Sequence, residues 1–129
     1  MHQSLNQIKS IVIVGSGNVA TNLGLTLFNK GYLIKQIWSR NLVNAETLAK
    51  KLNCTATNNL KEITNADLYI ATIKDDILRS VLDKLDVNNI VHTSGSLGLE
   101  VFNRKHKNYG VFYPLQTFIK KIHINFSDV

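Results

Sequence analysis

The sequence predicts an α/β domain with a doubly wound, mainly parallel sheet, and two observations carry this prediction. The first is the run 11–14, in which four apolar residues, Ile-Val-Ile-Val, follow one another without polar alternation. This composition suits a strand that is buried on both faces of a parallel sheet. The second is the alternation of strand-like runs with segments of helical periodicity along the rest of the 129-residue chain. Such alternation is typical of a doubly wound sheet.

The first helix is expected to follow a glycine-rich turn after that strand. Apolar residues spaced three and four positions apart define its buried face, and they are Val19, Leu23, Leu27 and Phe28. Gly31 follows its last residues, as is common at helix C-termini. Strand 32–38 comes next, and then a second helix for which Asn44 is the expected N-cap.

The same alternation continues along the chain. Segment 66–73 is the strongest later strand, because it is again almost continuously apolar. The other expected elements are a short strand at 55–57, a helical connection at 59–64, a helix at 75–85, a strand at 89–93, a helix at 97–102 and a last strand at 109–113.

A glycine motif, G-x-G-x-x-A, occupies 15–20, where the first strand must turn into the first helix. Gly15 permits the tight turn, Gly17 lets the backbone approach a pyrophosphate, and Ala20 is small enough for the helix to lie on the sheet. The N–H groups and the positive end of the helix dipole then attract phosphates. The motif predicts a dinucleotide site made by Gly15, Ser16, Gly17, Asn18 and Val19. A purely structural turn is the alternative.

The end of the second strand predicts which dinucleotide binds. NAD-selective sites usually carry an acidic residue about 20 positions after the glycines, where it holds the ribose 2′-hydroxyl. No acidic residue lies between Gly15 and Glu46. Arg40 can instead donate several hydrogen bonds to a 2′-phosphate. We therefore expect NADP as the cofactor, with Ser39, Arg40 and Asn41 at its 2′-phosphate. A solvated loop charge is the other interpretation of Arg40.

Composition and charge argue against several classes of protein. The 129 residues suffice for one domain with one core, and the apolar share of 44% is that of a globular protein. No apolar run approaches the ~18 residues of a membrane span, and no signal-peptide core is evident, so we expect a cytoplasmic protein without a membrane partner. The net charge of +6 is dispersed over short basic clusters, which argues against nucleic-acid binding. The single cysteine, Cys54, has no neighbours at zinc-binding spacing, and we expect no metal site.

The carboxyl ends of the later strands complete the candidate site, because ligands of such sheets bind there. Residues Ala71, Thr72, Ile73 and Lys74 are expected on the nicotinamide-ribose side. Thr93 can donate to the carboxamide, and His92 and Ser94 are the candidate catalytic residues, with His92 as a proton donor. Two structural interpretations stay open: His92 as a core histidine, and Ser94 or Ser96 as a helix cap.

Five segments together carry a resemblance: 15–20, 38–41, 66–71, 91–96 and 110–118. They resemble the N-terminal domain of a bacterial family of Rossmann-like oxidoreductases, which is similar in this domain to pyrroline-5-carboxylate reductase and to the deazaflavin-dependent NADP reductases. The resemblance implies an NADP-binding domain over 1–115. In the relatives a helical C-terminal domain follows, forms the dimer and completes the substrate cleft, and 116–129 is expected to begin the connection to it.

The function that these inferences imply is NADP(H) binding in an oxidoreductase that reduces a C=N or C=O bond of a small-molecule substrate. A homodimer, formed mainly through the C-terminal domain, is the expected assembly. Because the second domain is absent from these 129 residues, we expect the isolated chain to lack turnover. A non-catalytic NADP-sensing or scaffold domain is the alternative, since a fold alone does not fix a function.

Overall fold

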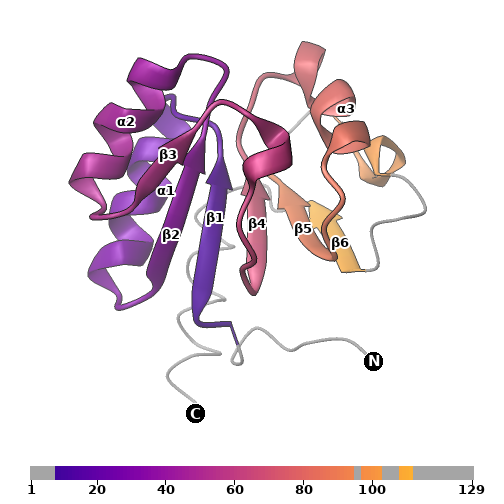
Figure 1. The fold of residues 1–129 in the computed structure, drawn as a ribbon. Helices are drawn as coiled ribbons and strands as arrows, with labels where there is room; N and C mark the ends of the chain where they lie inside the picture. The colour runs from indigo at the N-terminus through magenta and orange to yellow at the C-terminus, as the bar shows by residue number, and fades with distance from the viewer. Residues whose placement is uncertain (1–7, 95–96, 103–107, 112–129) are drawn as a thin grey trace.

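The computed structural model describes residues 8–94, 97–102 and 108–111. Within these residues six strands form one sheet in the order β3-β2-β1-β4-β5-β6, and every neighbouring pair is parallel. The arrow of β1 points upward in Figure 1, so the carboxyl ends of the strands lie at the upper edge. The strands are β1 (Ser10–Val14), β2 (Leu33–Trp38), β3 (Thr55–Thr57), β4 (Leu68–Ala71), β5 (Asn89–His92) and β6 (Asn108–Val111).

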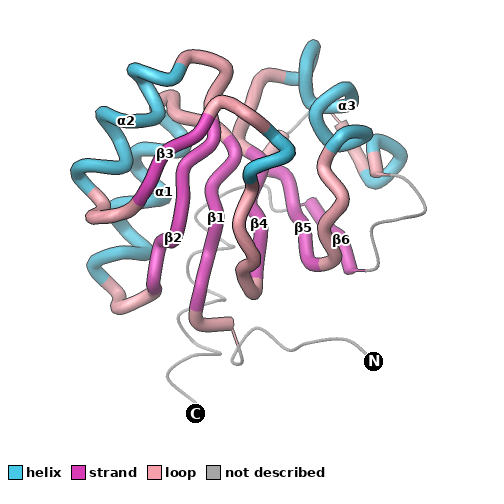
Figure 2. Tube along the Cα trace, in the orientation of Figure 1, coloured by secondary structure: helices cyan, strands magenta, loops and turns pink. Residues whose placement is uncertain are grey.

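Helices cover both faces of this sheet, as Figure 2 shows. Helices α1 (Asn18–Asn29) and α2 (Leu42–Lys51) pack on one face, and α3 (Asp75–Lys84) packs on the other. Two short 3-10 turns, η2 (Leu60–Glu62) and η3 (Leu99–Val101), complete the described elements. The prediction of a doubly wound α/β fold is therefore confirmed.

Strand β1 shows why its sequence is continuously apolar. Ile11 and Ile13 belong to the core beneath α1 and α2, whereas Val12 and Val14 belong to the core beneath α3. All four side chains are fully buried. Burial of one such side chain contributes about 1.5–3 kcal/mol, so a polar residue at any of these positions would destabilise the centre of the sheet.

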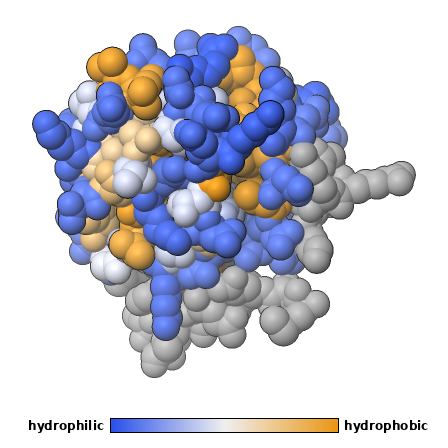
Figure 3. Space-filling view, in the orientation of Figure 1, coloured by the Kyte–Doolittle hydropathy of each residue, from blue (hydrophilic) through white to orange (hydrophobic). Residues whose placement is uncertain are grey.

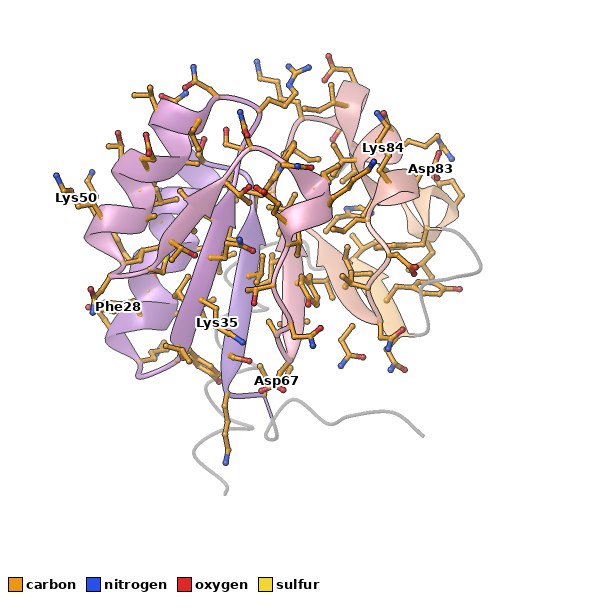
Figure 4. All side chains as sticks on the ribbon, viewed as in Figure 1. Phe28, Lys35, Lys50, Asp67, Asp83 and Lys84 are labelled. Atoms are coloured by element: carbon orange, nitrogen blue, oxygen red, sulfur yellow. The ribbon has the colours of Figure 1, made fainter. Side chains whose placement is uncertain are left out.

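Helix α1 lies close to the sheet through small residues. Its buried positions are Ala20, Leu23, Gly24 and Leu27. A Cβ atom at Gly24 would lie only 2.7 Å from Leu52 Cδ1, which shows how closely the helix and its neighbours pack. The expected apolar face was wrong at its ends, since Val19 is 41% exposed and Phe28 is 39% exposed. Figure 4 shows Phe28 at the outer rim of the molecule. The buried face of α1 differs from the predicted one because the small residues Ala20 and Gly24 face the sheet.

The structure moves several predicted boundaries. Helix α2 begins at Leu42 and is capped by Asn41, whose Oδ1 accepts a hydrogen bond from Asn44 N at 3.1 Å. The prediction of Asn44 as the cap was therefore wrong. The helix expected at 97–102 is only the turn η3, and the strand expected at 66–73 is the shorter β4. The last two residues of the strand expected at 109–113 lie outside the described residues.

Hydrogen bonds close the amino-terminal edge of the sheet. Asp67 Oδ2 accepts from the backbone N–H groups of Lys9 and Ser10 at 2.9 and 3.1 Å. The ammonium of Lys35 donates to the carbonyl oxygen of Asn65. Figure 4 shows Lys35 and Asp67 at the lower end of the sheet. These contacts occupy the edge opposite the carboxyl ends of the strands.

The surface in Figure 3 is largely hydrophilic, and its hydrophobic residues form separate patches on that face. Among the described residues, no helix is long and apolar enough to cross a membrane.

Candidate nucleotide-binding site

A cavity of about 310 Å³ lies at the carboxyl ends of β1, β2 and β4. Three segments that are distant in sequence line it: the glycine turn at 15–17, the end of β2 at 38–41, and the residues after β4 at 72–74. The structure thus brings together most of the residues that the sequence predicted for the cofactor. Asn44 and Ile77, one from each of two helices, also line the cavity and were not predicted.

Helix α1 begins directly after the lining residue Gly17 and has no side-chain cap, whereas Asn18 and Val19 are not among the lining residues. Gly17 is the N-cap residue, its backbone is extended, and no side chain accepts from the first N–H groups of the helix. Helix α2 differs, because Asn41 caps it. The N–H groups at the start of α1, which include those of Asn18 and Val19, are therefore suited to an anionic ligand.

The two glycines of the motif have different physical tasks. Gly15 has a φ of +141°, and a Cβ atom there would collide with the hydroxyl of Thr72. The protein itself therefore requires glycine at this position. Gly17 has an ordinary φ of −81°, and no atom lies within 4 Å of the place that its Cβ would occupy. Since the protein does not need a glycine there, the open space is available to a ligand.

Ser39 joins the first two segments of the cavity. Its hydroxyl oxygen accepts from the Ser16 hydroxyl at 2.9 Å and from Asn41 N at 3.2 Å. Its own backbone N–H donates to Thr57 O at 3.1 Å, which anchors it to β3. Ser39 is only 9% exposed, so these bonds form in a largely water-free environment. The glycine turn and the end of β2 are thereby held in one arrangement.

The charge at the cavity is positive. Arg40 and Lys74 are exposed and line it from the ends of different strands, and none of its lining residues is acidic. Within the described part of the chain, neither side chain makes a hydrogen bond or an ion pair that would neutralise it. Two such cations attract a phosphorylated ligand, because opposite charges interact favourably even when partly screened.

The sheet ladder extends past β4 and β5 at this edge. Thr72 N donates to Val14 O at 2.9 Å, and Thr93 N donates to Ala71 O at 3.3 Å. Thr72 and Ile73 line the cavity, whereas the Ala71 side chain is buried in the core beneath α3. Ala71 can therefore offer only its backbone to a ligand. Thr93 lies beside it and outside the cavity lining.

His92 and Ser94 lie beside that edge but do not line the cavity. The His92 side chain is fully buried, and both its ring nitrogens have backbone partners, at Gly98 and Ser94. The Ser94 hydroxyl accepts from Leu97 N at 3.1 Å. The structural interpretations of both residues thus have concrete partners, and their catalytic roles stay predictions.

Trp38 is a lining residue that the sequence did not reveal as functional. It is 3% exposed, and its indole Nε1 is buried without a hydrogen-bond partner among the described residues. Its place directly before Ser39 at a strand end was the available signal. Because it is the chain's only tryptophan, its fluorescence reports on this site alone.

A larger hollow of about 860 Å³ lies between α2 and β3, away from the carboxyl ends of the central strands. It contains Cys54, whose burial raises the pKa of the thiol to about 11. A thiol with this pKa stays protonated near neutral pH, so the residue has the character of a structural cysteine.

Solved structures resemble this fold closely. A Bacteroides fragilis protein described as an NADP oxidoreductase is 30% identical, with a TM-score of 0.80, over 95% of this chain and 59% of its own. A Thermotoga maritima protein is 20% identical, with a TM-score of 0.62, over 89% of this chain and 54% of its own. A pyrroline-5-carboxylate reductase of Coxiella burnetii is 20% identical, with a TM-score of 0.55, over 67% of this chain and 36% of its own.

The Thermotoga maritima and Coxiella burnetii structures are only 20% identical to this chain and show the fold alone. The chain spans about three fifths of the Bacteroides fragilis protein and about half of the Thermotoga maritima protein. The comparison with curated protein sequences found no match.

The family comparison covers the strands that build the cavity. Residues 10–93 match the family described as NADP oxidoreductase, coenzyme F420-dependent. The matched range includes the glycine turn, Arg40 and Lys74, and the sheet has the strand order of a Rossmann fold. The chain therefore belongs to this family of NADP oxidoreductases and carries its Rossmann-fold, nucleotide-binding domain.

Proposed function

We propose that the cavity binds NADP(H) in preference to NAD(H), in an oxidoreductase that reduces a C=N or C=O bond of a small molecule. One observation carries the choice of cofactor. The cavity joins an uncapped helix N-terminus to two cations and contains no carboxylate among its lining residues. NADP carries one more phosphate than NAD, and this site has the charges to hold it.

The pyrophosphate is assigned to the turn at the start of α1. Gly15, Ser16 and Gly17 line the cavity, and Ser16 offers a hydroxyl. Asn18 and Val19, at the start of α1, offer backbone N–H groups. The exposed side chain of Val19 does not oppose this assignment, because only its backbone takes part. The dipole of the 12-residue helix adds to the attraction.

The 2′-phosphate is assigned mainly to Arg40. Asn41 uses its side-chain Oδ1 to cap α2 and donates its backbone N–H to Ser39, so only its uncharged side-chain NH₂ can donate to a ligand. Ser39 accepts two hydrogen bonds and keeps its own O–H as a donor. Arg40 is the only one of the three with an uncommitted charged group within the described residues.

The nicotinamide half is assigned to residues 71–74 and Thr93, which continue the same edge of the sheet. When bound, the nicotinamide supplies or accepts the hydride. The residues of this chain hold and orient it. The substrate and the reaction of the whole protein are part of this proposal, since the chain spans 59% of the Bacteroides fragilis relative.

A titration tests the proposed function. NADPH, NADH and reduced coenzyme F420 are added separately to the protein, and heat release and Trp38 fluorescence are recorded. We expect NADPH to bind more tightly than NADH and to change the fluorescence. Equal affinity for NADPH and NADH would contradict the choice of NADP. Binding of F420 alone would contradict the assignment of the cavity to a nicotinamide nucleotide.

A further inference from the structure

The strongest unexplained feature outside the cavity is the environment of His92. This residue ends β5, its ring is fully buried, and both ring nitrogens are engaged. Nε2 lies 2.9 Å from Gly98 O, and Nδ1 lies 3.1 Å from Ser94 N. The ring therefore joins the chain immediately after β5 to the chain just before η3.

The partners determine which nitrogen carries the proton. A backbone N–H can only donate, so Nδ1 accepts from Ser94 and is unprotonated. A carbonyl oxygen can only accept, so Nε2 carries the proton and donates it to Gly98. In this arrangement the ring is a neutral Nε2–H tautomer. It cannot donate to a substrate without losing the bond to Gly98.

Aromatic and polar contacts hold the ring and its partners in place. The ring stacks on Phe102, with centroids 5.4 Å apart, and Phe102 stacks on Tyr109 at 4.8 Å. Gly98 is held from its other side, because its N–H donates to the Glu100 carboxylate at 3.2 Å. The ring of His92, the last residue of β5, thus holds Ser94 and Gly98 against the core; we call this arrangement the His92 brace.

The His92 brace lies next to the carboxyl end of β4, where the cavity begins. His92 pairs in register with Ala71, and Thr93 N donates to Ala71 O. Thr72, which follows Ala71, lines the cavity. A shift of the backbone at Thr93 and Ser94 would therefore change the wall that faces the nicotinamide half of the ligand.

We propose that His92 is a positioning residue rather than a proton donor: its neutral ring fixes the backbone at Thr93 and Ser94, which is bonded to Ala71 beside the wall assigned to the nicotinamide half of the nucleotide. This inference rests on the proposed function, because it assumes that NADP(H) occupies the cavity. The proposal predicts different effects on the two halves of the nucleotide. Changes at His92 affect the nicotinamide half, whereas Arg40 and the glycine turn hold the phosphates.

Two ligands distinguish the halves. NADPH contains both, and adenosine 2′,5′-bisphosphate contains the adenosine and its 2′-phosphate but no nicotinamide. His92→Phe keeps a stacking ring and removes both hydrogen bonds. We expect it to weaken NADPH binding about tenfold, because the loosened backbone at Thr93 and Ser94 must then be ordered when the nicotinamide half binds, and to leave the affinity for the bisphosphate unchanged. Phe102→Leu is the matched control, since it removes the stacking and keeps both hydrogen bonds.

The tautomer is tested on the unmodified protein. Long-range proton–nitrogen NMR correlations distinguish Nε2–H, Nδ1–H and doubly protonated rings, and the His92 signals are identified by their absence in His92→Gln. We expect the Nε2–H form both without ligand and with NADPH bound. An Nδ1–H or doubly protonated ring would overturn the proposal even if His92→Phe fails to fold.

The outcomes separate the two proposals. If the unmodified protein binds neither NADPH nor the bisphosphate, the proposed function fails. If it binds both, and His92→Phe binds NADPH as tightly as the unmodified protein does, the positioning role of His92 fails. An equal loss of affinity for both ligands would also overturn that role, because the effect would not be confined to the nicotinamide half.

Discussion

The hydroxyl of Ser16 donates to the hydroxyl of Ser39 across 2.9 Å, although 23 positions separate the two residues in the chain. Ser16 belongs to the turn assigned to the pyrophosphate, and Ser39 precedes the arginine assigned to the 2′-phosphate. Ser39 also accepts from Asn41 N, which fixes the direction of the chain around Arg40. One hydrogen bond therefore links the two proposed phosphate subsites.

A double-mutant cycle measures this link. Ser16→Ala, Ser39→Ala and the double variant are compared by NADPH titration and by denaturant unfolding. We expect the two substitutions to be non-additive by about 0.5–1.5 kcal/mol, the net value of one hydrogen bond. Additive effects on both measurements would mean that the hydroxyls act separately.

Arg40→Ala tests the choice of cofactor. Loss of the guanidinium removes charged hydrogen bonds to the 2′-phosphate, so NADPH should bind about 1.5–3 kcal/mol more weakly while NADH is little affected. Calorimetric titration of both nucleotides measures the difference. Lys35→Ala is the control, because Lys35 is a cation at the opposite edge of the sheet. An unchanged preference for NADPH in Arg40→Ala would remove Arg40 from the site.

Substitutions at the two glycines should have opposite consequences. Gly17→Val should fold, because the backbone is extended and the space around the new side chain is open, yet it should block the pyrophosphate. Gly15→Ala should instead destabilise the fold by about 1–3 kcal/mol, since φ is +141° and Thr72 is in the way. Circular dichroism, denaturant unfolding and NADPH titration separate the two effects. Normal NADPH binding by a folded Gly17→Val would place the nucleotide elsewhere.

Cys54 should be unreactive in the folded protein. Burial raises the pKa of its thiol from 9.0 to about 11, so little thiolate forms at about pH 8, where a disulfide reagent attacks free thiols. We expect slow labelling of the native protein and fast labelling in denaturant. Fast labelling of the native protein would show that the Cys54 thiol is accessible to the reagent.

The same shift in pKa makes a small, pH-dependent contribution to stability. The folded protein binds the thiol proton more tightly than the unfolded chain does. The contribution is therefore complete below pH 9.0 and is lost as pH rises towards about 11. The free energy of unfolding of Cys54→Ser should depend less on pH across this window than that of the unmodified protein.

The sequence by itself determined the sheet, the glycine turn and the positions of most lining residues. These features depend on near neighbours in the chain: an unbroken apolar run makes a buried strand, and small residues at fixed spacing make a tight turn. The same reasoning correctly placed segments 15–17, 39–41 and 72–74 at strand ends. In a parallel sheet the carboxyl ends of all strands lie on the same side. Predicting which residues end each strand therefore also predicted which residues lie close together.

Only the tertiary structure decided which partners each polar group takes. Periodicity predicted Val19 and Phe28 for the core, but α1 packs closely against its neighbours through Gly24, and both side chains are exposed. His92 gained two backbone partners from a loop that no local pattern predicts. Ser16 and Ser39 lie together because the ends of β1 and β2 are paired, with Val14 opposite Trp38. Ser16 and Ser39 are 23 positions apart, and the His92 partners depend on the path of the loop after β5, so register and packing set the geometry of these contacts.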